Sequence, residues 1–312
     1  MRWGFESQKN VKQGPGDGRF SLCNHFAVYS FWNGIWLPLS MMRYVLMVFL
    51  LVSALALRAQ EKAPKVQIDT LEMRDLQEVD HSAFEVGEYL RFRLHYGMVD
   101  AGEAELTIHP SPKKFKGRDA YHIVGKGRTL GAFNWFYKVN DTYETYLDQH
   151  GAFPWEFVRD IREGGYTKYQ NYQFHQDRAA VITHKGDTFG SLDFAQDMLS
   201  AFYYARTFDF SNVKEGDIFT IPTFVDEENY PLQIKFIGRE VLKSRTGKYE
   251  CLKFVPVLQK GRVFKDENDM IVWVTDDENK IPILAKAKVL VGSIKMELVE
   301  YKNIRNPLAK LD

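Results

Sequence analysis

Asp197 and Arg206 form the charged pair best placed to do chemistry, because both flank a short segment of otherwise apolar and aromatic residues. Two interpretations are open. In the functional one, Arg206 meets an anionic group of a ligand at the mouth of a cavity, and its neighbour Tyr203 also contacts the ligand. In the structural one, Asp197 caps the start of a helix and Arg206 complements the helix dipole at its end, each worth roughly 0.5 to 1 kcal/mol.

Aromatic side chains are dense over residues 133–174, and we select Trp135, Trp155 and Tyr169 as candidate ligand-binding residues. Aromatic residues occur at both parities of the expected strands, whereas a single buried face needs only one. Part of the set could therefore line a concave surface that binds a lipid, another amphiphile or a glycan. Ordinary core packing explains most of the set equally well.

Enzyme and metal signatures are missing from the sequence. It has no Gly-x-Ser-x-Gly elbow, phosphate loop, dinucleotide fingerprint or His-Glu-x-x-His helix. The histidines are scattered singly, and the acidic clusters at 226–228, 266–269 and 276–278 lack calcium-loop spacing, so they are interpreted as turn residues. Cys251 lies in an apolar stretch typical of a buried, inert thiol. We therefore expect no metal, no cofactor and no catalytic residue; a hydrolase with two carboxylates across one cleft is an alternative.

The elements that position these residues are mostly strands. Leu90, Phe92 and Leu94 alternate with polar residues, and a turn over 97–102 leads into a second strand over 104–108, which predicts an antiparallel hairpin. Repeats of this pattern predict about a dozen strands, too many for an α/β alternation. The others are expected at 121–125, 139–147, 155–161, 166–174, 179–183, 218–225, 232–241, 249–258, 270–275, 283–289 and 293–301.

One segment breaks the strand pattern. Over 197–207, Leu199, Phe202, Tyr203 and Arg206 fall at i, i+3, i+4 and i+7, the spacing of one helical face. A shorter helical turn is expected near 130–136. We therefore predict an all-β, mainly antiparallel fold: a strongly curved sheet or β-barrel-like domain with one amphipathic helix packed against it or plugging it.

Segment 41–59 has the three parts of a secretory signal peptide: a positive Arg43, an apolar stretch over 44–57 and small residues near Ala59. The apolar stretch is shorter than the roughly 20 residues of a spanning helix, so we expect cleavage and no stable membrane span. Residues 1–40 are then a start-site extension outside the mature protein. A competing interpretation, one membrane segment over 26–57, would place Pro38 and Arg43 inside a lipid-facing helix, where both are costly.

The mature chain would keep 253 of the 312 residues, enough for a large core. We expect a mobile lead-in over 60–83, a single β domain over 84–303 and a C-terminal tail over 304–312. The first 59 residues hold six Lys or Arg and two Asp or Glu, so 35 basic and 39 acidic residues remain. This slightly acidic balance gives no reason to expect nucleic acid as a partner.

Several motifs together resemble a known family. They are Gly87-Glu88-Tyr89-Leu90 with Tyr96 and Gly102, the segment DMLSAFYYAR over 197–206, Gly216-Asp217, and TGKYEC over 246–251. From about residue 84 to 301 the chain resembles exported bacterial proteins grouped as domain of unknown function 3108 (DUF3108). The resemblance implies an all-β protein of the Gram-negative cell envelope, with no established activity. A likeness to the curved sheets of periplasmic lipoprotein carriers is an analogy of fold and does not establish function.

Two functions follow as hypotheses. The first is a periplasmic, non-catalytic binding or carrier module for a lipid or another hydrophobic or amphipathic ligand. The second is an envelope assembly or scaffold protein that binds another envelope protein through sheet edges and exposed aromatic residues. A cavity near Arg206 that is open to solvent would favour the first, and a filled interior would favour the second.

Overall fold

The computed structural model describes residues 62–257, 270–288 and 292–312. Its strands are β1 (Tyr89–Tyr96), β2 (Val99–Pro110), β3 (Ala120–Thr129), β4 (Asn140–Asp148), β5 (Pro154–Glu163), β6 (Tyr166–His175), β7 (Ala180–Thr183), β8 (Thr188–Gly190), β9 (Ile218–Val225), β10 (Glu228–Ser244), β11 (Gly247–Pro256), β12 (Met270–Thr275), β13 (Pro282–Lys288), β14 (Ser293–Lys302) and β15 (Lys310–Leu311). The helices are α3 (Gly131–Phe136), α4 (Ser200–Arg206) and the short 3-10 turns η1 (Ile68–Thr70) and η2 (Gln176–Arg178). The expected signal peptide and start-site extension lie outside these residues.

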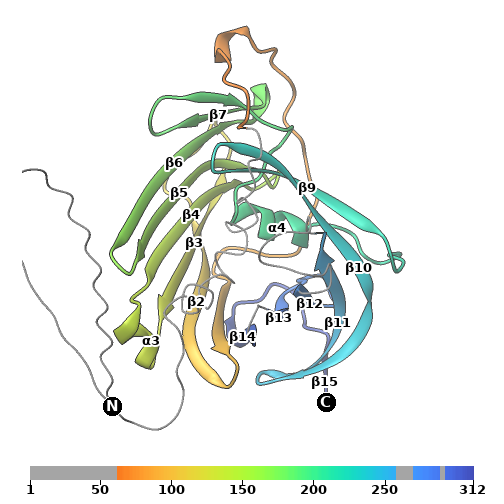
Figure 1. Ribbon diagram of the computed structural model, residues 1–312. Coiled ribbons are helices and arrows are strands. Elements are labelled where there is room, and N and C mark those ends of the chain that lie inside the picture. The colour runs from red at the N-terminus through yellow and green to blue at the C-terminus, as the bar shows by residue number, and fades with distance from the viewer. Residues whose placement is uncertain (1–61, 258–269, 289–291) are drawn as a thin grey trace, which may run out of the picture. The chain divides into compact units, whose positions relative to one another are not determined.

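The strands form one antiparallel sheet in the order β8-β7-β6-β5-β4-β3-β2-β1-β14-β13-β12-β11-β10-β9, and β15 pairs with β11. The sheet is strongly curved, and α4 lies inside the curve (Figure 1). It is not closed, because β8 and β9 end the strand order without pairing with each other. The all-β, strongly curved prediction is confirmed, with an open sheet in place of a closed barrel.

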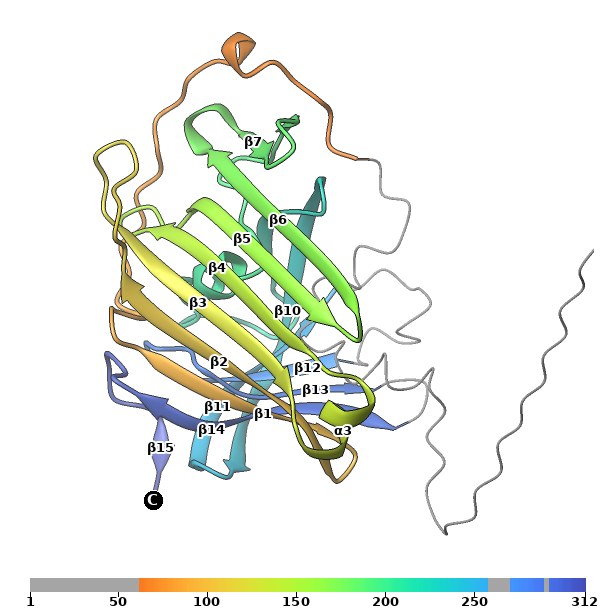
Figure 2. The same ribbon diagram turned by 90° about the vertical axis from the view of Figure 1, so that its left-hand side faces the viewer.

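Strands β1 to β6 lie side by side as successive antiparallel neighbours (Figure 2). Their buried residues alternate with less buried ones, as in β4 and β5, so one face of this half carries most of the core. This is the alternation from which the strands were predicted, and the expected strands recur with ends shifted by a few residues.

Two turns are tighter than expected. In the first hairpin, Gly97 has a φ of 59° and β2 begins at Val99, so the predicted turn over 97–102 shrinks to two residues. Between β9 and β10, Asp226 and Glu227 both have positive φ values, 53° and 69°. A two-residue hairpin turn needs this left-handed backbone, which lets β10 begin at Glu228.

Both edge strands are covered over part of their length. Beside β8, residues 64 and 66 make backbone hydrogen bonds of 2.8 and 3.1 Å with Gly190 and Thr188. Beside β9, Gln196 donates to Pro222 at 2.7 Å and accepts from Phe224 at 2.8 Å. Covering an edge removes an open template for pairing with other chains. The segment expected to be a lead-in thus contacts the sheet, while the domain boundaries themselves stay predictions.

Candidate ligand-binding site

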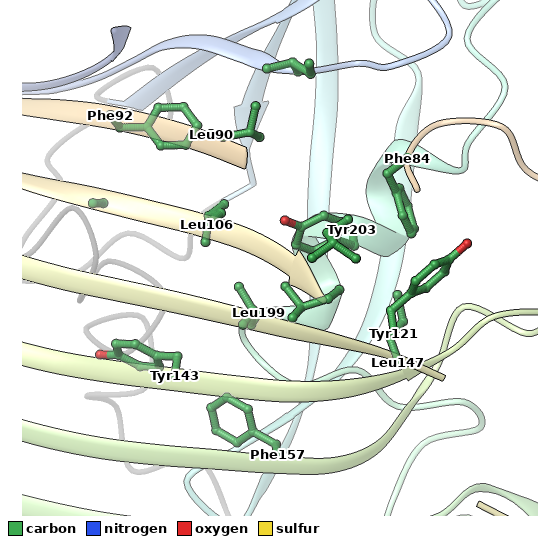
Figure 3. Close-up of a cluster of buried hydrophobic side chains, with 14 of the residues drawn as sticks. Phe84, Leu90, Phe92, Leu106, Tyr121, Tyr143, Leu147, Phe157, Leu199 and Tyr203 are labelled. Carbon is green, nitrogen blue, oxygen red and sulfur yellow. The ribbon is translucent and has the colours of Figure 1, made fainter. Parts of the chain in front are cut away.

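Helix α4 separates two regions inside the curve of the sheet. One side of it, with Leu199 and Tyr203, packs into the large core formed with β1 to β5 (Figure 3). Gly125 of β3 lies beneath the start of this helix: a Cβ atom there would be in ordinary contact with Leu199 at 3.7 Å and in tight contact with Leu106 at 3.2 Å. The helix is therefore held against strands β1 to β5.

The other side of α4 lines an apolar pocket of about 230 Å³. Four residues spaced at i, i+3, i+4 and i+7 form this side of the helix segment: Met198, Ala201, Phe202 and Ala205. They face residues of β9 to β13, which we call the second half of the sheet. Phe202 lines this wall and also packs against the large core, so it contacts both regions. The remaining lining residues are Arg206, Phe210, Ile221, Leu232, Ile234, Phe254, Pro256, Met270, Val272, Val274, Lys280 and Pro282.

The strand residues around this pocket share one face of the sheet. Their register puts Ile221 opposite Leu232, Ile234 opposite Pro256, and Phe254 opposite Val272. Several of them are only half-buried, including Leu232, Ile234 and Val272. An apolar face that residues 62–257, 270–288 and 292–312 do not cover completely is typical of a place where an apolar ligand binds.

Arg206 lines this pocket, but its charge is already paired. The guanidinium makes two hydrogen bonds with the Glu88 carboxylate, at 2.6 and 2.7 Å, and both residues are almost fully buried. It also donates to the carbonyl oxygens of Asn279 at 2.8 Å and Ala83 at 2.9 Å. Burial favours the neutral form, but Glu88 outweighs it and keeps the pKa of Arg206 above its ordinary value. Four donated bonds leave this side chain little capacity to receive a ligand anion.

Lys280 is the second charged residue of the pocket lining, and it was not predicted from the sequence. It lies in the turn between β12 and β13, where Asp277 Oδ1 accepts hydrogen bonds from the backbone N–H groups of Asn279 and Lys280, at 2.9 and 3.2 Å. Burial lowers the pKa of Lys280 against the opposing effect of Asp277. The turn that begins with the acids at 276–278 is the one that presents this lysine.

Asp197 has the structural role that one interpretation gave it. It is fully buried, and its Oδ1 accepts hydrogen bonds from the N–H groups of Leu199 at 2.7 Å and Ser200 at 2.9 Å, at the start of α4. Its Oδ2 accepts a bond of 2.7 Å from Thr145. Burial raises the pKa of Asp197 to about 6. Arg206 differs from that interpretation, since its main partner is Glu88 instead of the helix end.

The other candidate ligand-binding residues are scattered. Trp135 on α3 is 84% exposed, and Tyr169 on β6 is 55% exposed. Trp155 is buried in a separate cluster and donates to Asp148 at 3.0 Å, and Tyr203 is buried in the main core. Of the five selected residues, Arg206 alone is among those that line the pocket between α4 and the second half of the sheet.

A second polar group lies on the concave side of β4 to β6. Asp226, at the tip of the β9–β10 hairpin, pairs with the buried Arg159 and with Lys168, the latter at 2.7 Å. Nearby, burial together with the negative charge of Asp141 raises the pKa of Glu163 to about 7. Neither acid lines the apolar pocket beside α4, so this pair does not supply two carboxylates across that pocket.

Metal ligands do not gather anywhere in the described part of the chain: within 62–257, 270–288 and 292–312, no group of three or more His, Cys, Asp or Glu side chains is placed to hold a metal ion. In the same ranges, none of the helices has the length and apolar character required to cross a bilayer. Cys251 is buried, as predicted, and burial raises the pKa of its thiol to about 12, which suppresses the nucleophilic thiolate.

Several solved structures are similar in fold at low sequence identity. A β-barrel-like protein of the DUF1849 family from Brucella abortus has a TM-score of 0.47 and 9% identity, over 72% of this chain and 98% of that one. A protein from Parabacteroides distasonis, provisionally described as a lipoprotein, has a TM-score of 0.30 and 11% identity, over 73% of this chain and 100% of that one. A protein from Bacteroides fragilis, provisionally described as exported and YmcC-like in fold, has a TM-score of 0.28 and 9% identity over the same shares.

Curated proteins offer no match to the chain. A family model does match, over residues 91–299, which is most of the curved sheet with α4. Its description is "Protein of unknown function (DUF3108)", the family indicated by the sequence motifs. The chain therefore belongs to the DUF3108 family.

Proposed function

We propose that the protein is an exported, non-catalytic binding module that holds a hydrophobic or amphipathic ligand in the pocket between α4 and strands β9 to β13. The observation that carries the proposal is the pocket itself, whose lining is apolar except for Arg206 and Lys280. Its rigid wall, α4, is held by the core on its other side, so the pocket does not depend on a ligand to form. Preformed apolar pockets with few polar groups are the usual form of small-molecule sites.

Export is the part of the proposal that rests on the sequence alone. The ordered basic, apolar and small-residue parts of segment 41–59 support it. Export and an apolar pocket together fit a carrier or binding module in the periplasm of a Gram-negative cell envelope. Peptide mapping of the cellular protein tests export, because cleavage of the signal peptide should leave a mature N-terminus near Gln60.

An uncharged probe tests the pocket most directly. Decanol should bind to the purified protein in a saturable way, measured by calorimetry or by NMR shifts of the methyl groups of Val272 and Leu232. Ala205→Phe adds a ring to the pocket wall and should abolish binding, whereas Tyr204→Phe, on the same helix but outside the lining, should leave it unchanged. Equal binding by both variants, or none by the wild-type protein, would refute the proposal.

A scaffold function is the second candidate, and one feature favours it. Trp135 and Phe136 on α3 are 84% and 65% exposed, and Met98 and Val99 on the β1–β2 hairpin are also exposed. Large exposed apolar residues are enriched where proteins bind one another. A photocrosslinker at Trp135 should then capture one envelope protein in cells. A chain that stays uncrosslinked would count against the scaffold function.

A further inference from the structure

We propose that the ligand of the pocket is an amphiphile with a single chain and an anionic head, and that Lys280 binds the head. This inference rests on the proposed function, because it assigns the chemistry of the ligand in the same pocket. The two charged residues of the lining, Arg206 and Lys280, differ in how many of their N–H donors are already hydrogen-bonded. This difference identifies which of them binds the head group.

Arg206 is excluded as the head-group residue by its contacts. Glu88 neutralises its charge through two hydrogen bonds, and two backbone carbonyl oxygens accept two more. A ligand carboxylate would have to displace Glu88, which is almost fully buried and would lose its partner. Removing one member of a buried pair is strongly unfavourable, so the Arg206–Glu88 pair acts as part of the wall.

Lys280 has the opposite character. Its ammonium donates one long bond of 3.3 Å to the carbonyl oxygen of Glu278. The carboxylates of Asp277, Glu278 and Asp209 act on it through their charge and not through a hydrogen bond. The pocket walls are nearly all carbon, so we place the ligand head at the pocket rim, where two of the three ammonium N–H donors of Lys280 have no acceptor within the described part of the chain. An anion beside it would stabilise a charge that burial now disfavours.

The turn that carries Lys280 is well fixed. Asp277 accepts a bond of 2.9 Å from Thr275, in addition to those from the backbone of residues 279 and 280. Asn279 is fully buried and donates to the carbonyl oxygens of Asn306 at 2.9 Å and Pro307 at 3.3 Å. The base of the lysine is therefore held in place before any ligand arrives, which lowers the cost of binding.

The size of the pocket limits the tail of the ligand. About 230 Å³ exceeds the roughly 150 Å³ of an engineered cavity that binds benzene, and is below the roughly 300 Å³ at which ordinary ligand pockets begin. A pocket of this size favours a ligand with one chain over a ligand with two acyl chains. One medium-length chain fits, with its apolar end against Met198 and Phe202 and its head towards Lys280.

Three probes of equal chain length separate the head from the tail: decanoate, decanol and decyltrimethylammonium. The wild-type protein should bind decanoate about tenfold more tightly than decanol, the effect of one charge-assisted hydrogen bond, and should bind the cation most weakly. Lys280→Gln should remove the preference for decanoate and leave the affinity for decanol unchanged. Lys235→Gln, at a β10 residue outside the pocket lining, is the matched control and should keep the preference.

The outcomes distinguish this inference from the function on which it rests. If decanol binds but decanoate binds no better, or if the preference survives in Lys280→Gln, the anionic head and its lysine are wrong while the apolar pocket stands. If none of the three probes binds to the wild-type protein, the proposed function itself fails. The order of affinities in the wild-type protein tests the inference even if a variant does not fold.

Discussion

Buried charged side chains contribute strongly to the stability of the interior, and Glu88 is the clearest case. Replacing Glu88 with Gln leaves the Arg206 guanidinium buried without a counter-charge, which should lower the free energy of unfolding by roughly 3 to 5 kcal/mol. Urea unfolding measures the loss. Glu85→Gln changes an exposed carboxylate three residues earlier and should have almost no effect. A loss as small as that of the control would mean that Glu88 does not hold Arg206.

At the same scale, Glu163 should make stability depend on pH. Its pKa is raised from 4.5 to about 7, chiefly by burial and by Asp141, so the folded chain binds a proton that the unfolded chain releases. Stability should therefore be greatest below pH 4.5 for this group and should fall as pH rises to about 7, by roughly 3 kcal/mol, since one pKa unit corresponds to about 1.4 kcal/mol.

Glu163→Gln should remove that fall, because an amide does not titrate. Unfolding in urea at a series of pH values compares the wild-type protein with the variant. Glu215→Gln, at an exposed position, should keep the wild-type pH dependence. If the curve of Glu163→Gln also keeps it, the Asp141–Glu163 pair is not the source.

Among the elements, α4 is positioned by the strand beneath it. Gly125→Val on β3 crowds Leu106 and adds methyl groups against Leu199, so these side chains must shift and stability should fall by about 1 to 3 kcal/mol. Gly127 lies two residues further on the same face of β3, and a Cβ atom there would have no neighbour within 4 Å, so Gly127→Val should be tolerated. Decanol binding should weaken only in Gly125→Val, because this change disturbs the seating of α4, and α4 forms a wall of the pocket.

Local patterns explain which elements could be predicted. Strands such as β9 and β12 and the helix α4 are defined by the spacing of neighbouring residues, whereas β8 and β15, with three and two residues, are too short to show a period. The site depends on contacts that are distant in sequence. Arg206 meets Glu88 across 118 residues, and nothing near either one indicates that pairing.

The aromatic residues show the same limit. Trp135 and Trp155 are equal by type, yet one is 84% exposed at a short helix and the other is buried beside Asp148. Residue type alone could not show which of the two is exposed, because the exposure of each depends on the pairing of strands and on the position of α3. The pocket, too, needed the second half of the sheet to be placed opposite α4.

For the whole molecule, the open sheet is joined across its interior by the tip of one hairpin. Asp226, between β9 and β10, reaches Arg159 on β5 and Lys168 and Gln170 on β6, in the other half of the sheet. Burial alone would raise the pKa of Asp226, but Arg159 and Lys168 hold it below its ordinary value. This contact takes the place of the hydrogen bonds that would close a barrel.

Asp226→Asn should therefore loosen the link between the two halves. It leaves Arg159, which is 1% exposed, without its carboxylate, and should cost about 2 to 4 kcal/mol. Asn tolerates the left-handed backbone of the turn, so the change acts through charge. Glu227→Gln is the matched control in the same turn, because the partner of Glu227 is the exposed Lys62 and such pairs contribute about 0 to 1 kcal/mol. Native-state hydrogen exchange should then speed up in β9 and β10 for Asp226→Asn alone; equal exchange in both variants would show that the hairpin tip does not join the halves.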